Sequence, residues 1–177
     1  MSDDLPTIQR VLDGDIAAFR RLVERYQRPL FSMIGNLLHD RNDCDDLAQE
    51  TFLAAYQHLR SYDPRAGGFS TWLLTIARNK CLNRLKKQTP LAMETPPEPI
   101  DARQPADDLA ETEFFACLDR ALDSLPFEQK IAFVLSEIEG LPHEEICRIE
   151  GAPLGTVKSR LSRAKEKLRS LLPPPSE

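Results

Sequence analysis

The stretch that decides the fold is PLGTVKSRLSRAKEKLRSLL, residues 153–172. Its apolar residues recur at steps of three and four, a spacing that places them on one face of a helix. These residues are Leu154, Val157, Leu161, Ala164 and Leu168. Between residues 155 and 169 there are six Lys or Arg residues and one acidic residue. We therefore expect an amphipathic helix with a basic polar side, on which Ser159, Ser162 and Arg163 point outward.

A shorter segment just upstream gives this helix its context. Leu141 and Pro142 precede HEEICRIE, in which Ile146 and Ile149 are expected to turn inward, and Gly151 ends the segment. Glycine is the residue that most often occupies the left-handed position after a helix. A short helix, a tight turn with glycine and a longer basic helix together predict a helix-turn-helix, whose second helix enters the major groove of DNA.

The rest of the chain also shows helical periodicity. We expect a first long helix capped by Asp13 or Asp15 and bent or divided at Pro29, because proline removes a backbone donor. A second helix capped by Asn42 and a third capped by Ser70 follow. Helical patterns return after residue 108, with a restart at Pro126, and no strand-like alternation of useful length occurs. The fold class is therefore predicted to be all-α.

Residues 89–108 interrupt the helical pattern. They contain five prolines and carry a net charge of −4. Such a composition favours an extended chain that repels itself. We therefore expect two small helical domains joined by a flexible, acidic, proline-rich linker, with boundaries at 5–88, 89–108 and 109–172.

The distribution of charge matters more than the net charge of −5. Residues 78–87 contain five basic residues and no acidic one, whereas residues 40–50 contain five acidic residues and one Arg. Charges further apart than about 10 Å are screened at ordinary salt, so a polyanion would sense the basic segments locally. An acidic total therefore does not exclude nucleic acid as a ligand.

Several function classes find no support in the sequence. Cys44, Cys81, Cys117 and Cys147 are at least 30 residues apart and form no CxxC motif, so we predict four reduced thiols and no metal site. There is no HExxH motif, glycine-rich phosphate loop or plausible nucleophile pairing, and we expect neither an enzyme nor a bound cofactor. No apolar run suggests a signal peptide or a membrane span.

Three segments together resemble one family. DCDDLAQETFLAAY (43–56), FSTWLLTIARNK (69–80) and GTVKSRLSRAKEKLR (155–169) look like the bacterial sigma factors of the extracytoplasmic-function (ECF) class. The resemblance covers roughly residues 5–88, as a sigma-2-like domain, and 109–172, as a sigma-4-like domain. It implies a protein that binds core RNA polymerase, recognises promoter DNA at the −35 and −10 elements, and helps to open the duplex.

The resemblance also implies three groups of site residues. Those expected to bind core polymerase are Asp46, Gln49 and Glu50. The unpaired −10 strand is expected to be bound by the loop between Ser61 and Ser70 together with Asn79, Lys80, Asn83 and Arg84, to which the basic face of the helix adds Arg78. Those expected at the −35 element are Lys158, Ser159, Ser162 and Arg163, with Arg160, Lys165 and Lys167 as phosphate contacts. Cys81 and Leu82 depart from the polar character of the −10 stretch.

A second possible function is that of a stand-alone helix-turn-helix regulator that binds duplex DNA without polymerase. The basic C-terminal helix suits both. The acidic helix at 43–56 suits only the sigma factor, because an acidic face repels DNA and needs a protein partner. The family also implies a separate anti-sigma factor as a regulator, and a bacterial cytoplasmic location without membrane insertion.

Overall fold

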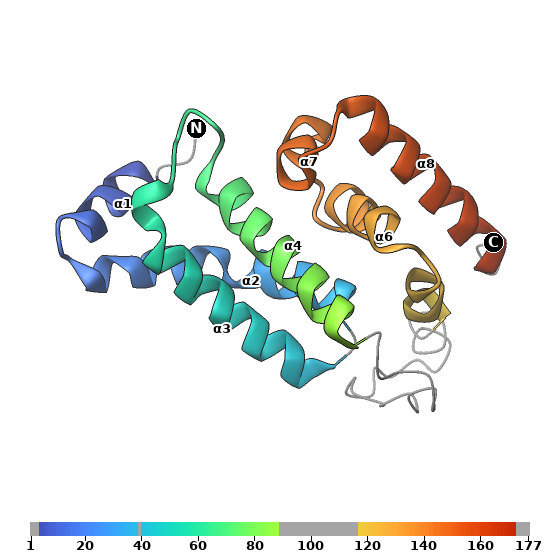
Figure 1. Cartoon of the computed structure of the whole chain (residues 1–177), viewed down its shortest axis with the longest axis horizontal. Helices are drawn as coiled ribbons and strands as arrows, with labels where there is room; N and C mark the ends of the chain where they lie inside the picture. The colour runs from blue at the N-terminus through green and yellow to red at the C-terminus, as the bar shows by residue number, and fades with distance from the viewer. Residues whose placement is uncertain (1–3, 39, 89–116, 173–177) are drawn as a thin grey trace, which may run out of the picture.

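The computed structural model describes residues 4–38, 40–88 and 117–172, and within these ranges it contains helices and no strands. The prediction of an all-α protein is confirmed. The N-terminal half consists of α1 (Leu5–Leu12), η1 (Ile16–Ala18), α2 (Phe19–Leu37), α3 (Arg41–Gln57), η2 (Leu59–Ser61) and α4 (Phe69–Gln88). Helices α2, α3 and α4 pack against one another (Figure 1). The predicted linker at 89–108 lies outside the described residues.

The C-terminal half begins, within the described residues, with a helical segment at 117–123. It continues with α6 (Phe127–Phe133), a π-helical turn η3 (Val134–Ile138), α7 (His143–Glu150) and α8 (Leu154–Leu171). Pro126 is the N-cap of α6, as expected for a restart at that proline. None of the helices within the described ranges is long and apolar enough to cross a bilayer.

The presence of the long helices was predicted correctly, but the residues that cap their N-termini mostly were not. Asp15, one of two candidate caps for the first long helix, accepts a hydrogen bond from the backbone N–H of Ala18 at 3.2 Å and thereby caps η1, whereas the N-cap of α2 is Ala18. The prediction of Asn42 as a cap is wrong, because the Asp40 carboxylate accepts from the N–H of Asn42 at 2.8 Å and α3 begins at Arg41. Ser70 is not a cap either, since α4 already begins at Phe69. Helix α1 was not predicted.

Two features of the long helices differ from simple expectation. Helix α2 runs from Phe19 to Leu37 with Pro29 inside it, so the proline does not divide the helix. In α8, Val157, Leu161, Ala164 and Leu168 are buried, but Leu154 is 40% exposed. Leu154 is the first residue of α8. Periodicity predicts which face of a helix is apolar, but not how far along that face the neighbouring helices reach.

The helix-turn-helix has the predicted geometry. Gly151 follows α7 with φ 61° and ψ 33°, the left-handed conformation in which glycine avoids the steric cost of a Cβ. The N–H of Ala152 donates to the carbonyl of Cys147 at 3.1 Å and closes the end of α7. Ile146 and Ile149 are buried as expected. The turn thereby directs α8 across α6 and α7, which both contact it.

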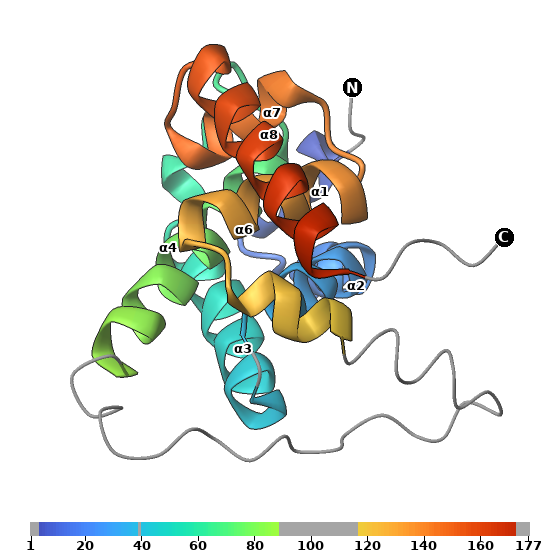
Figure 2. The same cartoon turned by 90° about the vertical axis from the view of Figure 1, so that its right-hand side faces the viewer.

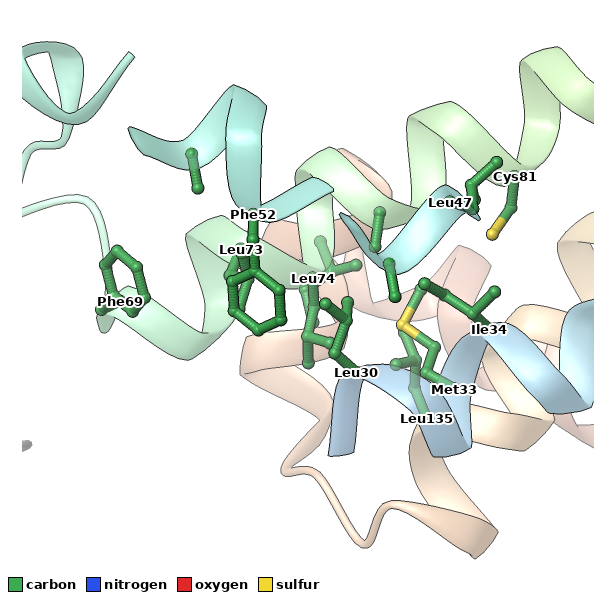
Figure 3. Packing of buried hydrophobic residues seen from close by; sticks show 14 of the residues in the cluster. Leu30, Met33, Ile34, Leu47, Phe52, Phe69, Leu73, Leu74, Cys81 and Leu135 are labelled. Carbon is green, nitrogen blue, oxygen red and sulfur yellow. The ribbon is translucent and has the colours of Figure 1, made fainter. Parts of the chain in front are cut away.

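One apolar cluster joins the two halves of the chain. It contains Leu30, Met33 and Ile34 of α2 together with Leu135 of η3 and Ile146 of α7. Figure 3 shows Leu135 below the side chains of Met33 and Ile34. A smaller cluster, formed by Leu122 and Leu125 with Ala164 and Leu168, holds segment 117–123 against α8. Contact between the halves was not part of the sequence-based prediction.

Candidate functional site

The outer surface of α8 carries the residues expected to read duplex DNA. Lys158, Ser159, Ser162 and Arg163 are all exposed, as the helical wheel predicts. Lys158 and Ser162 line a shallow hollow along the helix with Lys165 and Arg169. The Ser159 hydroxyl donates to the carbonyl of Thr156 at 2.9 Å, so its oxygen still has capacity to accept a hydrogen bond from a ligand.

Three basic side chains of α8 have partners within the C-terminal half. Arg160 donates to Glu150 at the end of α7. Lys165 forms an ion pair with Glu137 at 2.9 Å and holds the pKa of that carboxyl below its usual range. Lys167 donates to the carbonyl of Ser124. The structure therefore shows that three of the predicted −35 residues, Arg160, Lys165 and Lys167, also brace α8 against the rest of the C-terminal half.

The Arg160–Glu150 pair is the most buried ionic contact within the helix-turn-helix. The Glu150 side chain is fully buried, and the Arg160 side chain is 25% exposed. Burial raises the pKa of Glu150, and the charges of Arg160 and, more weakly, Arg78 oppose that increase. Glu150 Oε1 is buried without a hydrogen-bond partner. The carboxylate thus depends on Arg160 for the direct hydrogen bond that offsets its desolvation.

The predicted −10 residues lie along α4 and border α3. A hollow between the two helices is lined by Leu47, Glu50, Lys80, Asn83, Arg84 and Lys87. Across it, Lys80 pairs with Glu50 at 3.1 Å, and Arg84 pairs with Asp43 and with Glu50 at 3.7 Å. Two of the expected DNA-binding cations are therefore neutralised by acidic residues of α3. Sequence reasoning did not link these segments, although their opposite charges were visible.

Arg78, Asn79 and Asn83 differ in their exposure. Asn79 and Asn83 are exposed. Arg78 is partly buried, and its guanidinium lies 5.8 Å from the centre of the Phe127 ring of α6, a cation–π arrangement. Its Nη1 donates to the side chain of Asn79 at 3.0 Å, while its Nε is buried without a partner. Arg78 therefore faces the C-terminal half.

The loop before α4 is closed by its own contacts. The Tyr62 hydroxyl donates to the carbonyl of Gly67 at 3.1 Å, and the N–H of Arg65 donates to Asp63 at 2.9 Å. The rings of Tyr62, Phe69 and Trp72 pack together with centroid separations of 5.5–5.8 Å. The loop is thus anchored on an aromatic cluster at the start of α4.

The acidic face of α3 has the predicted arrangement. Asp46, Gln49 and Glu50 are exposed, while Leu47 and Ala55 are buried on the other side of the helix. Leu53, four residues after Gln49, is 57% exposed and continues the same face. Leu53 is not among the predicted site residues. Its position could have indicated a role, because Leu53 is a leucine that does not share the helix face of the buried residues Leu47 and Ala55.

The cysteines lie apart from this surface chemistry. Burial raises the pKa of the Cys44 thiol to about 11 and that of Cys81 to about 12. Thiols with such values react slowly, because the thiolate is the reactive form. Across residues 4–38, 40–88 and 117–172, no three His, Cys, Asp or Glu side chains are grouped so that they could hold a metal ion.

Comparison with known proteins gives two family matches and a set of close relatives. Residues 22–90 match sigma-70 region 2, and residues 115–168 match sigma-70 region 4. The chain is 37% identical over 180 residues to the ECF RNA polymerase sigma factor SigE of Mycolicibacterium smegmatis, covering 96% of this chain and 69% of the relative. It is 32% identical over 186 residues to the ECF RNA polymerase sigma-E factor of Haemophilus influenzae, covering 97% and 96%.

Two solved structures are similar in fold over most of the chain. CnrH in complex with the cytosolic domain of CnrY matches with a TM-score of 0.73 and 25% identity, covering 96% of this chain and 97% of CnrH. The sigma factor RpoE in complex with the anti-sigma factor NepR from Bartonella quintana matches with a TM-score of 0.71 and 26% identity, covering 86% and 95%.

The Arg160–Glu150 pair generates a prediction about stability. Arg160→Ala leaves a buried carboxylate without its hydrogen-bonded cation, and we expect the free energy of unfolding to fall by about 2–3 kcal/mol. Arg163→Ala, an exposed cation on the same helix, should change it by less than about 0.5 kcal/mol. Urea unfolding followed by circular dichroism measures both variants. Equal destabilisation by the two would contradict this structural role for Arg160.

The same pair predicts a dependence on pH. A carboxyl whose pKa is raised in the folded state contributes stability when protonated and loses it as pH rises through that pKa. Removal of Arg160 takes away the group that most opposes the increase. The stability deficit of Arg160→Ala should therefore be larger at pH 7 than at pH 5, and the added substitution Glu150→Gln should remove this difference.

Proposed function

The chain belongs to the extracytoplasmic-function sigma factors of RNA polymerase, and from this premise we propose how its residues divide the work of promoter-specific initiation. The acidic face of α3 binds core polymerase, α4 with its preceding loop binds the unpaired −10 strand, and α8 binds the −35 duplex. This division follows predicted domains at 5–88 and 109–172 connected by a linker at 89–108. The observation that carries it is the presence of two opposite electrostatic surfaces on separate helices.

The polymerase-binding role of α3 rests on the grouping of its exposed side chains. Asp46, Gln49 and Glu50 form an acceptor-rich face that would repel DNA, and Leu53 adds an exposed apolar side chain next to it. A desolvated apolar anchor beside charged hydrogen-bonding groups is typical of a protein–protein contact. We infer a basic, partly apolar surface on polymerase as its partner.

The −10 role of α4 rests on a polar face beside an anchored loop. Asn79 and Asn83 offer amide donors and acceptors of the kind that bind the edges of unpaired bases. Arg78, Lys80 and Arg84 provide charges for the backbone. Because Lys80 and Arg84 are paired with Glu50 and Asp43, a DNA strand would have to replace those carboxylates with phosphates.

The −35 role of α8 rests on its exposed polar side. Arg163, Ser159 and Lys158 are exposed. We expect Arg163 and Ser159 to contact base edges when α8 enters the major groove, and Lys158 to contact a phosphate. Three further basic residues of α8 already contact other residues of this chain, namely Arg160, Lys165 and Lys167. If they also contact phosphates, that role adds to their bracing of α8.

The regulation of the chain follows the same premise. Relatives with the same arrangement are found in complex with the cytosolic domain of CnrY and with the anti-sigma factor NepR. We propose that an anti-sigma factor likewise binds this chain, and that it acts in the bacterial cytoplasm, where polymerase transcribes. Such proteins act by binding rather than by catalysis. The stand-alone regulator is not favoured, because it gives the acidic face no role.

The polymerase contact predicts the outcome of a double substitution. Asp46→Ala with Gln49→Ala should weaken binding to core polymerase by about 2–5 kcal/mol, because charge-assisted hydrogen bonds are lost at a desolvated interface. Binding of the full-length variant to core is measured by fluorescence anisotropy. Asp45→Ala, an exposed acid on the same helix, is the matched control and should bind normally. Full affinity in the double variant would place the polymerase site elsewhere.

The −10 contact predicts a defect in promoter opening. Holoenzyme with Asn83→Ala should bind the promoter but leave its −10 thymines less reactive to permanganate, because a base contact to the unpaired strand is missing. Lys87→Ala, on the same face one turn later, changes charge rather than base contact and serves as a comparison. Normal opening by Asn83→Ala would remove Asn83 from the site.

The −35 contact predicts a difference between readout and anchoring. Arg163→Ala should cost ~1–3 kcal/mol on a specific −35 duplex and relax specificity, whereas Lys158→Ala should weaken all duplexes alike and lower the salt slope by about one. Binding to specific and random duplexes across a salt series measures both. An equal loss on the two duplexes for Arg163→Ala would make it another phosphate anchor.

A further inference from the structure

We propose that Asp4 is a positioning residue for the −10 site, because its buried carboxylate holds Tyr26 of α2 against the aromatic cluster that anchors the loop before α4. The proposal rests on the −10 role proposed above for that loop. Asp4 is the N-cap of α1, and α1 contacts η2 just before the loop begins. Figures 1 and 2 show α1 and the loop at the same end of the N-terminal half.

The Asp4 carboxylate is buried but does not cap its own helix. Asp4 is only 1% exposed, and its side chain accepts no hydrogen bond from the first turn of α1. An aspartate at the N-cap ordinarily accepts such a bond. Burial of a carboxylate is costly unless other groups donate hydrogen bonds to it. The groups that compensate for the burial of Asp4 therefore have to come from another element.

Both partners of Asp4 come from α2. Arg25 donates to one carboxylate oxygen, and the Tyr26 hydroxyl donates to the other at 2.5 Å. The Arg25 side chain is 51% exposed, whereas Tyr26 is partly buried. Burial and the hydrogen bond to Asp4 raise the pKa of Tyr26, so its hydroxyl stays protonated and remains a donor. Asp4 thus fixes Tyr26 through a charge-assisted hydrogen bond, which is stronger than one between neutral groups.

Tyr26 transmits this constraint to the aromatic cluster. The centre of its ring lies 5.4 Å from that of Phe69, which is fully buried at the start of α4. Phe69 also packs against Tyr62 at 5.8 Å and against Trp72 at 5.7 Å. A displaced Tyr26 ring would either move Phe69 or leave a void beside it, and both are costly in a packed cluster.

The cluster holds both ends of the loop. Tyr62 lies at its start and Phe69 at its end, and residues 63–66 between them are exposed. The Tyr62 hydroxyl donates to the carbonyl of Gly67 at 3.1 Å and closes the loop across its base. A loop that is already held in one shape binds a ligand more tightly, because less conformational freedom is lost on binding. Asp4 would act on the −10 strand in this way without touching it.

The alternative is that Asp4 only stabilises the packing of α1 on α2. Three variants of the full-length chain separate the two roles. Asp4→Ala removes the carboxylate, and Tyr26→Phe removes only the hydroxyl and keeps the ring. Val11→Ala is the matched control, because Val11 is a buried residue of the same helix and its truncation leaves the carboxylate in place.

Two measurements follow the cluster and the −10 contact separately. Trp72 is the only tryptophan of the chain, so acrylamide quenching of its fluorescence reports on the cluster in the free protein. The rate at which −10 thymines become reactive to permanganate reports promoter opening by the holoenzyme. Binding to core polymerase, measured by fluorescence anisotropy, shows whether the acidic face of α3 is intact.

We expect Asp4→Ala and Tyr26→Phe each to increase the quenching of Trp72. Each should also slow opening by about fivefold or more, the scale of one lost hydrogen bond to a charged group, with normal binding to core. The double variant should open no more slowly than the slower single variant, because two residues that act through one contact do not have additive effects. Val11→Ala should change the opening rate by less than about twofold, since it shares no partner with Asp4.

If circular dichroism shows that Asp4→Ala has lost helix, Tyr26→Phe takes its place and must by itself increase quenching and slow opening. A folded Asp4→Ala variant that opens the promoter at the wild-type rate overturns the proposal, whatever its Trp72 quenching. Equal slowing by Val11→Ala, or additive losses in the double variant, also overturns it. Failure of the wild-type holoenzyme to open the promoter would instead count against the proposed function.

Discussion

Burial of one apolar cluster by helices from both halves of the chain is the constraint on which the rest of the structure depends. Leu30, Met33 and Ile34 of α2 are fully buried, and Leu135 and Ile146 from the C-terminal half complete the same cluster. Their burial brings α7 against α4 and thereby decides which polar residues remain available to a ligand.

The polar residues around this cluster serve structure and recognition at the same time. Arg160 satisfies a buried carboxylate, Lys165 pairs with Glu137, and Lys130 is buried between the halves. In a small helical protein that must bind DNA, basic residues are numerous, and some of them stabilise the fold. A basic side chain on a recognition helix is therefore not automatically a DNA contact.

Ion pairs within the chain can reduce the nonspecific binding of a protein whose basic residues are proposed to contact DNA. Lys80 and Arg84 would carry exposed positive charge if Glu50 and Asp43 were elsewhere, and nonspecific attraction to nucleic acid would follow. Pairing with acids of α3 reduces that attraction. The same Glu50 belongs to the face proposed for polymerase, so binding at one surface can change the charge available at the other.

The sequence by itself determined the features that depend on local spacing. The apolar stripe of α8 from Val157 onward, the inward Ile146 and Ile149, the left-handed Gly151 and the acidic face of α3 all follow from patterns within a few residues, and each lies where it was predicted. The family resemblance followed from the same local patterns, since its three segments are themselves helices with characteristic polar faces.

Only the tertiary structure decided how those helices meet. The contacts of Thr71 with Glu145 and of Lys130 with Leu37 join residues 74 and 93 positions apart. No periodicity encodes such pairs, because they depend on the packing of whole helices. The sequence placed Arg163 on the outward face, where it is exposed, but for the same reason it could not show that Arg160 holds a buried carboxylate. It predicted a basic helix, and the packing determined which of its cations remain available.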